Sequence, residues 1–197
     1  ISRPVRGVRV AVMFVLTLLC ALVVAAPAVA APADLDPTFG AGGILINSLV
    51  PAQDSVDDVA IQPDGKIVIA GRAFIGAGFD MLVARFNPDG TPDTGFGGGD
   101  GFATESMGTA LDAVEAVVVQ PNGRIVVAGY FDAGPKDQMA ALRFLPDGTL
   151  DASFSSDGRA NYWYGLAGTS DAYAVDVAIQ PDGKLLLAGF TDEAGTQ

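Results

Sequence analysis

Short apolar runs alternate with turn residues along most of the chain. Residues 59–61 and 67–70 are two such runs, and Pro63, Asp64 and Gly65 lie between them. Proline presets the backbone for a tight turn, aspartate bonds its own backbone, and glycine accepts a positive φ. The pattern therefore predicts a β-hairpin with a positive φ at Gly65, and no segment after the N-terminal apolar block has a helical period.

This hairpin pattern recurs. Residues 58–66 return letter for letter as residues 176–184, and a looser copy occupies residues 117–124, so the period is 58 and then 60 residues. A period this long is typical of arrays whose units must stack to bury their apolar faces. The repeated turn positions are Gln62, Pro63, Asp64 and Gly65, then Gln120, Pro121, Asn122 and Gly123, then Gln180, Pro181, Asp182 and Gly183.

Each period holds further strand signals. Residues 81–86 and 139–144 are apolar runs that end in Arg-Phe and lead into a second Asp-Gly turn. A Gly-rich segment, residues 35–43 in its first copy, precedes strand candidates at Ile44–Ile46 and, one period later, at Phe102–Glu105. Because the run at 67–70 is apolar at every position, we expect it to be buried on both faces. The sequence thus predicts an all-β fold with about four strands per period.

Three motifs in a fixed order resemble the delta-60 repeat, a β-propeller repeat of exported bacterial proteins. They are the Gln-Pro-Asp-Gly-Lys hairpin at 62–66, the Arg-Phe turn that begins at Arg85, and the Asp-x-x-Phe-Gly segment at 36–40. The resemblance covers residues 33–191 and implies a propeller fold and export, but no defined activity. It divides residues 31–197 into repeats 36–92, 93–150 and 151–197. The last is truncated, so we expect an incomplete propeller-like array of about 2.5 to 3 four-stranded repeats.

The first 30 residues have the pattern of a secretory signal peptide. A basic stretch precedes an apolar core at 10–24, and Ala28-Val29-Ala30 is a small-x-small cleavage site. A retained membrane helix is the alternative, which Pro27 and Pro32 disfavour. Lipid attachment at Cys20 is disfavoured because Leu19 precedes it, where that processing needs a small residue. We therefore expect a secreted or cell-surface protein with no membrane span after cleavage.

The charge of the chain argues against anionic partners. The sequence has 11 basic and 23 acidic residues, and loss of residues 1–30 removes three basic residues, which leaves 8 against 23 and a net charge of −15. Such a surface repels nucleic acid and anionic lipid. The one cysteine lies in the signal segment, so no disulfide is expected. Because the chain starts at Ile1 and Gln197 falls inside the third repeat, a fragment is expected, with further blades of the same chain as partners.

Residue types exclude several chemistries. The chain has no histidine, which excludes histidine triads and histidine zinc sites. Asp57 and Asp58 are adjacent on a strand and should point to opposite faces, which argues against a shared glycosidase site. The loop from Asn87 to Asp93 offers three oxygens to calcium, but its equivalent begins with Leu145, so turn formation is favoured over calcium. No cofactor and no catalytic residue is predicted.

Two sets of periodic or clustered side chains remain as candidates. Arg85 and Arg143 could form a binding ring, but a structural ion pair of each with Asp93 and Asp151, respectively, is favoured. The aromatic cluster Tyr162, Trp163 and Tyr164 occurs in the third repeat alone. Packing is the commoner role of such residues, yet residues outside the repeat pattern are where a repeat scaffold places its function. They are therefore candidate ligand contacts.

Two functions follow from these observations. The favoured one is a binding or structural module for an extracellular protein or glycan. The alternative is a propeller enzyme, a hydrolase or lyase, whose catalytic residues lie in blades outside this sequence. In either case we expect the terminal faces at Val177–Ile179 and Leu185–Leu187 to be open, so that the isolated chain assembles or aggregates.

The signal peptide can be tested directly. N-terminal sequencing of the exported protein should begin at Ala31 or within a few residues of it, because the small-x-small site ends at Ala30. A mature form that keeps the apolar core at 10–24 would contradict this prediction.

Overall fold

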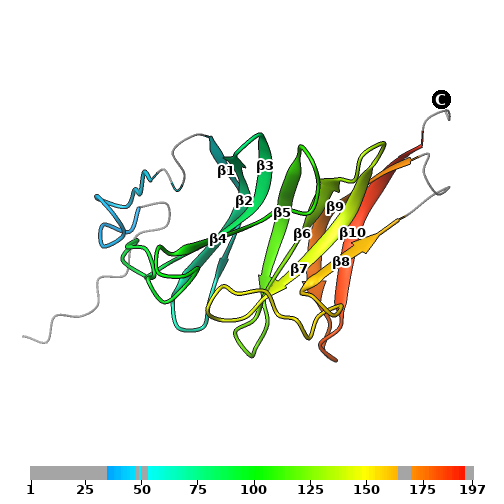
Figure 1. The fold of residues 1–197 in the computed structure, drawn as a ribbon. Coiled ribbons are helices and arrows are strands. Elements are labelled where there is room, and N and C mark those ends of the chain that lie inside the picture. Colours follow the sequence, from blue (N-terminus) through cyan, green and yellow to red (C-terminus); the bar gives the residue numbers. More distant parts are fainter. Residues whose placement is uncertain (1–34, 48, 50–52, 164–169, 194–197) are drawn as a thin grey trace, which may run out of the picture. The chain divides into compact units, whose positions relative to one another are not determined.

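The computed structural model describes residues 35–47, 49, 53–163 and 170–193 (Figure 1). These residues belong to one compact unit that begins at Leu35. Within them the chain forms ten strands and no α-helix, so the all-β prediction is confirmed. It follows that no described helix is long and apolar enough to cross a membrane. The predicted signal peptide at 1–30 lies outside the described residues.

The strands form three antiparallel sheets. The first sheet has the order β1-β2-β3-β4, the second β5-β6-β7-β8, and the third contains β10 and β9. The strands are β1 (Asp54–Ile61), β2 (Ile67–Ile75), β3 (Gly78–Phe86), β4 (Phe102–Glu105), β5 (Asp112–Val119), β6 (Ile125–Asp132), β7 (Asp137–Phe144), β8 (Arg159–Tyr162), β9 (Ser170–Ile179) and β10 (Leu185–Glu193).

The sheets do not coincide with the sequence repeats. Strands β1 to β3 come from repeat 36–92, but β4 lies in repeat 93–150, after its Gly-rich segment. Strand β4 pairs with β3, with Ala103 opposite Val83, and β8 pairs with β7 in the same way, with Ala160 opposite Ala141. Each four-stranded sheet is therefore completed by the repeat that follows it.

The predicted strand at Ile44–Ile46 is wrong. This segment makes only an isolated bridge between Gly40 and Ile44. Its later equivalents, β4 and β8, are strands because each pairs with the third strand of the sheet before it. No sheet precedes residue 44 among the described residues, so the segment has no such neighbour. The apolar pattern alone could not reveal this.

Every first strand carries a β-bulge opposite a glycine. The register shifts between Val56 and Asp58 in β1, and equivalent shifts occur in β5 and β9. A Cβ on Gly71 or Gly129 would lie 2.0 Å from the carbonyl oxygen of Ser55 or Ala113, respectively. The glycine that ends each Ala-Gly pair is thus required by the close approach of the bulged strand.

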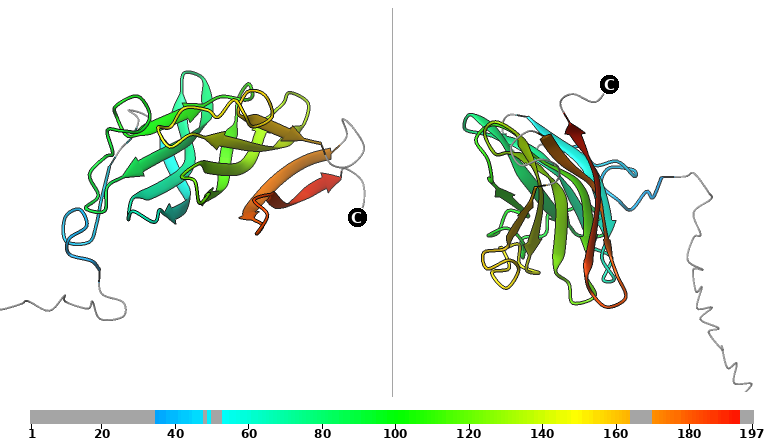
Figure 2. Two further views of the ribbon diagram at one scale, coloured as in Figure 1. Left: turned by 90° about the horizontal axis from the view of Figure 1, so that it is seen from below. Right: turned by 90° about the vertical axis from the view of Figure 1, so that its right-hand side faces the viewer.

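Two apolar cores lie between the sheets, which follow one another along the unit (Figure 2). The second sheet contributes to both cores, and residues 125–129 of β6 are all buried. The prediction that residues 67–70 are buried on both faces is only half right, because Val68 and Ala70 are buried whereas Ile67 and Ile69 are half-buried. Residues 68, 70, 81 and 83 of the first sheet and residues 114, 117, 125 and 127 of the second form most of the first core. The second core joins Ala116, Val126 and Ala128 to Ala172, Ala174 and Val177.

The prediction that residues 177–179 and 185–187 form one open face needs correction. Val177 is buried against the second sheet, with 3% of its surface exposed, whereas Leu186 is 55% exposed. Alternate side chains of a strand point to opposite faces, so only Ala178 and Leu186 belong to the open face. Leu185 and Leu187 pack against the second core instead.

The role of the bulge glycine can be measured by substitution. We expect Gly129→Ala to destabilise the protein by about 3 kcal/mol, because the new methyl would overlap the Ala113 carbonyl and force β5 and β6 apart. Gly183→Ala is the control, since its φ is 82° but no atom lies within 4 Å of the added carbon, so only about 1 kcal/mol of left-handed strain is expected. Urea unfolding measures both, and a smaller loss for Gly129→Ala would contradict the steric account.

Candidate functional site

The three repeated turns have the same geometry. The Gly65 N–H donates to the Gln62 carbonyl at 2.9 Å, and the Lys66 N–H donates to Asp64 Oδ1 at 3.2 Å. Gly65, Gly123 and Gly183 have φ angles of 84°, 80° and 82°, so the expectation of a positive φ is confirmed. Asn122 and Asp182 accept from the backbone two residues on, as Asp64 does. These polar groups are used by the turns themselves.

The structure brings Arg85 and Asp93 together. Arg85 Nε donates to Asp93 Oδ2 at 2.7 Å, and Lys66 Nζ donates to the same oxygen at 2.9 Å. The other carboxylate oxygen accepts the Gly95 N–H at 3.0 Å. Arg85 and Asp93 are both buried. Lys66 is a partner that sequence spacing did not suggest, although it ends the repeated hairpin motif.

These contacts determine the ionisation of Asp93. Burial alone would raise its pKa, but hydrogen bonds from Lys66, Gly95 and Arg85 and the charge of Arg85 outweigh burial and lower the pKa from 3.8 to about 2. Asp93 is therefore a carboxylate at neutral pH, with two cations beside it. The arrangement suits a structural ion pair better than a proton-transfer group.

The same arginine joins two sheets. Its guanidinium carbon lies 4.8 Å from the centre of the Phe96 ring, and Arg85 Nη1 donates to the Pro146 carbonyl of the second sheet at 2.6 Å. Next to Phe96, the Gly97 N–H donates to the Asp147 carbonyl at 2.9 Å. We call Arg85, Asp93 and Phe96 the first joint, because they connect the first sheet to the β7–β8 turn of the second.

A second joint repeats this arrangement one period later. Arg143 Nε and Arg124 Nε donate to Asp151 Oδ2 at 2.8 and 2.7 Å, and Arg143 lies over the Phe154 ring at 4.8 Å. Hydrogen bonds from Ser153, chiefly that of its hydroxyl, lower the pKa of Asp151 despite burial. Here Arg143 Nη2 donates to the Ser153 hydroxyl rather than to the turn of another sheet.

A comparison with known protein families matches the two segments that contain the first two repeated turns and the two joints. A family model described as Domain of unknown function (DUF5122) beta-propeller matches residues 62–96 and 120–154. Each matched segment begins at a turn glutamine and ends at a joint phenylalanine. The chain is similar to this β-propeller family over these two segments, and its four-stranded sheets form an incomplete propeller-like array. No curated protein matches this sequence.

The loop from Asn87 to Asp93, which could offer oxygens to calcium, does not direct those oxygens toward a common point. Asp89 Oδ1 accepts the N–H and the hydroxyl of Thr91 at 2.9 and 2.7 Å, and Asn87 Nδ2 donates to Thr91. Asp93, the third oxygen donor considered for calcium, belongs to the first joint. Within the ranges that the structure describes, no group of three acidic, cysteine or histidine residues is placed to hold a metal.

The aromatic candidates lie on an outer strand of the second blade. Tyr162 ends β8, and Trp163 follows it; their exposed fractions are 39% and 44%. Tyr164 falls outside the described residues. In the first blade, Glu105 occupies the position of Tyr162, because Met81 pairs with Glu105 and Met139 pairs with Tyr162. Tyr162 and Trp163 thus stand in the second blade at the positions that Glu105 and Ser106 occupy in the first.

Two carboxylates on the bulges were not identified as a site from the sequence. Asp57 and Glu115 occupy the extra position of the bulges in β1 and β5. Burial raises the pKa of Glu115, the charge of Asp57 raises it further, and Arg72 lowers it. Asp57 and Glu115 come from neighbouring blades. The first strand of each of these two blades therefore carries an acidic side chain at its bulge. Only knowledge of the bulge position could have singled them out.

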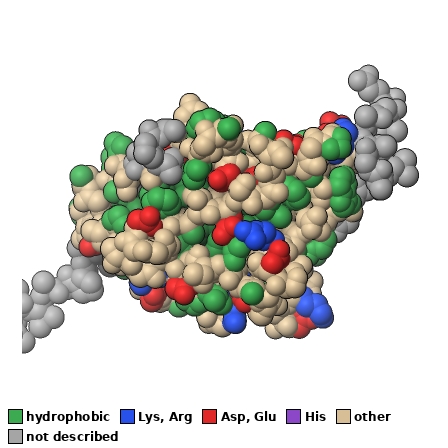
Figure 3. All heavy atoms as spheres, in the orientation of Figure 1, with side chains coloured by type: hydrophobic (Ala, Val, Ile, Leu, Met, Phe, Trp, Pro, Cys, Tyr) green, Lys and Arg blue, Asp and Glu red, His purple; other side chains and the backbone are tan. Residues whose placement is uncertain are grey.

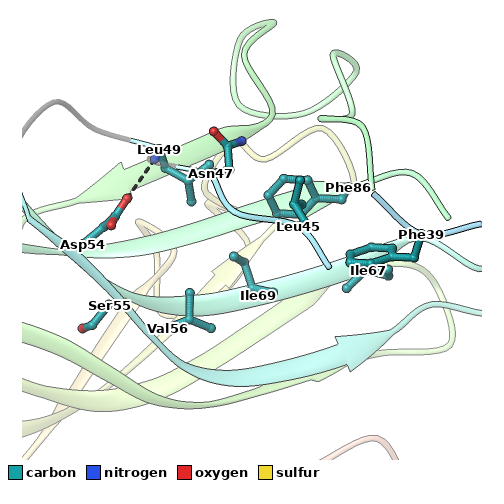
Figure 4. Close-up of a pocket in the computed structure, with 10 residues that line it drawn as sticks. All are labelled: Phe39, Leu45, Asn47, Leu49, Asp54, Ser55, Val56, Ile67, Ile69 and Phe86. Atoms are coloured by element: carbon teal, nitrogen blue, oxygen red, sulfur yellow. Dashed lines mark hydrogen bonds between the residues drawn. The ribbon is translucent and has the colours of Figure 1, made fainter. Parts of the chain in front are cut away.

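An apolar pocket of about 260 Å³ lies on the first blade (Figure 4). Leu45, Asn47 and Leu49 extend from the segment that crosses the sheet, and Ile67, Ile69 and Val56 extend from the strands below it. The Leu49 N–H donates to Asp54 Oδ2 at 2.8 Å at one end of the pocket. The pocket therefore lies between the segment that carries Leu45 and Leu49 and the outward face of the first sheet.

The first joint predicts an acid-sensitive contribution to stability. A carboxylate whose folded pKa is about 2 and whose ordinary pKa is 3.8 stabilises the fold above about pH 4, and this contribution is lost as the pH falls towards 2. We expect Asp93→Asn to cost about 3 kcal/mol at pH 7, since it leaves buried Arg85 without its counter-charge. The variant should lose less further stability than wild type between pH 5 and pH 2.

The control for this experiment is Asp64→Asn, which places in the first turn the residue that the second turn has as Asn122. Urea unfolding followed across this pH range should leave the control within about 0.5 kcal/mol of wild type. Equal pH dependence in wild type and Asp93→Asn would contradict the assignment of the low pKa to the joint.

Proposed function

We propose that the chain is part of an exported or surface-displayed propeller of the delta-60 type that binds an extracellular glycan or protein. The observation that carries the proposal is the exposed pair of Tyr162, which ends β8, and Trp163, which follows it. Both side chains are large, partly apolar and accessible, and both stand where the first blade has small or charged residues. The repeated residues of this scaffold form its turns and joints. Residues that depart from the repeat, such as Tyr162 and Trp163, are therefore available for binding.

The position of the pair supports a contact with a large partner. It lies at the end of an outer strand, next to Asn161, whose Nδ2 donates to the Gln138 side chain at 2.9 Å. An aromatic ring offers an apolar face to a sugar ring or to an apolar side chain, while tyrosine hydroxyl and indole N–H groups offer hydrogen bonds. The contact therefore suits an uncharged glycan or a protein surface.

Charge narrows the class of partner further. On the face shown in Figure 3, the few basic side chains lie beside acidic ones. Arg159 of this blade pairs with Glu105 of the first blade, so this arginine is not a free anion-binding group. Together with the expected net charge of −15, this supports a neutral or cationic partner rather than an anionic one.

Trp163 provides its own reporter, since it is the one tryptophan of the chain. Titration with cellulose and chitosan oligosaccharides should change its emission if a glycan covers the ring. We expect Tyr162→Glu, which copies Glu105 of the first blade, to weaken binding about tenfold or more while Trp163 still reports it. Ile46→Ser, which alters a 93% exposed side chain on another segment, is the control.

The outcomes separate the candidate functions. Binding that Tyr162→Glu weakens supports the module, whereas binding that is indifferent to Tyr162 would remove the aromatic pair from the site. Cleavage of the oligosaccharides during the titration would instead identify an enzyme.

A further inference from the structure

Two polar residues next to the aromatic pair of the proposed site also depart from the repeat. Asn161 of β8 donates from Nδ2 to Gln138 Oε1 of β7 at 2.9 Å. The strand registers place Asp80 and Thr104 of the first blade at the positions of Gln138 and Asn161. The second blade therefore has two carboxamides and two aromatic side chains at positions where the first blade has neither type.

Gln138 is a buried anchor for the exposed Asn161. Only 6% of the surface of Gln138 is accessible, whereas Asn161 is exposed. A buried amide oxygen needs a hydrogen-bond partner, and Asn161 supplies it. This bond uses one N–H of Asn161, and a carboxamide has a second N–H and an oxygen besides. The anchor therefore orients Asn161 and leaves it a donor and an acceptor for a ligand.

The exposure of Asn161 does not arise from the limits of the sequence. Asn161 pairs with Ala140 of the first core, so it lies on the side of the second sheet that faces the first blade. That neighbouring blade has all four of its strands. Tyr162 lies on the other side, since it pairs with Met139 of the second core. An extended chain carries alternate side chains to the same side, which places Trp163 on the side of Asn161.

The charged residue two positions before Asn161 is already paired. Arg159 lies on the same side of β8 and forms an ion pair with Glu105 at the end of β4. This ion pair links the outer strands of the two blades and holds the first blade beside Asn161. Because each of these charges has its counter-charge, the surroundings of Asn161 favour an uncharged ligand.

We propose that Asn161 and Trp163 form a subsite for a neutral glycan with a vicinal diol, and that Asn161 is its specificity-determining residue. The Asn161 oxygen accepts from one hydroxyl and its second N–H donates to the next, while the indole ring lies against the apolar face of the sugar. Gln138 is a positioning residue, because it acts through Asn161. This inference rests on the proposed binding function and narrows the partner of that site to a glycan.

The anchor explains why a carboxamide at this position suits a glycan. A sugar hydroxyl exchanges hydrogen bonds with water for hydrogen bonds with the protein, so each contact adds little net affinity. Such contacts contribute most when the protein group is ordered before the ligand arrives, because no further side-chain entropy is then lost. The bond to Gln138 provides this order for Asn161.

Two neutral oligosaccharides with the same linkage test the preference for a diol. Cellulose oligosaccharides carry hydroxyls on C2 and C3 of each ring, and chitin oligosaccharides carry an acetamido group in place of the C2 hydroxyl. We expect the full chain, followed by Trp163 emission, to bind the cellulose oligosaccharide about tenfold more tightly than the chitin oligosaccharide. Asn161→Thr, which copies Thr104 of the first blade, should lose this preference and bind the cellulose oligosaccharide about tenfold more weakly than wild type.

The role of Gln138 needs a variant that keeps the fold. Gln138→Met has a side chain of similar length, and Asn161 can then bond to water, so urea unfolding should show a stability close to that of wild type. Affinity for the cellulose oligosaccharide should fall about threefold, because Asn161 is no longer held. The double variant Gln138→Met/Asn161→Thr should bind as Asn161→Thr alone does, since Gln138 acts through Asn161. A glutamine with only a structural role would leave the affinity unchanged in Gln138→Met.

The outcomes distinguish this inference from the proposed function. If Tyr162→Glu weakens binding but Asn161→Thr does not, the aromatic site stands and the subsite at Asn161 is wrong. If Asn161→Thr weakens the binding of both oligosaccharides equally, Asn161 does not recognise the diol. A wild-type chain that binds neither oligosaccharide would overturn the glycan subsite and leave a protein as the partner of the proposed module.

Discussion

A sheet with two apolar faces is stable in water only when both faces are covered, and the rest of this structure depends on that constraint. The second sheet satisfies it, because it lies between two cores and β6 is buried along residues 125–129. The first joint connects the first two sheets beside this apolar contact. Arg85 serves both purposes, since it neutralises Asp93 within one blade and donates to the Pro146 carbonyl of the next.

Much of this fold could be predicted from the sequence, since its signals are local. The turns at Gln62, Gln120 and Gln180 need particular residues at particular positions, and the Arg85–Asp93 pairing was suggested by a shared period. The strand at Ile44–Ile46 could not be judged in this way, since a strand needs a neighbour that an apolar pattern does not supply. Lys66 was missed as a partner of Asp93 because the two residues meet only after the hairpin and the third strand have folded back.

The candidate site was less accessible to sequence reasoning than the fold. The aromatic pair could be picked out because it breaks the repeat, but its exposure depends on which side of β8 faces solvent. The carboxylates of Asp57 and Glu115 look like ordinary strand residues in sequence. A bulge places them at the extra position, and the clearest local trace of that bulge is the glycine opposite, Gly71 or Gly129.

The outer strand that each four-stranded sheet takes from the next repeat means that the sequence repeat and the folded sheet have different bounds. A duplicated segment with the bounds 93–150 would begin with the last strand of one sheet and end before the last strand of its own. Such a segment cannot complete a blade by itself, but it can always extend an existing array.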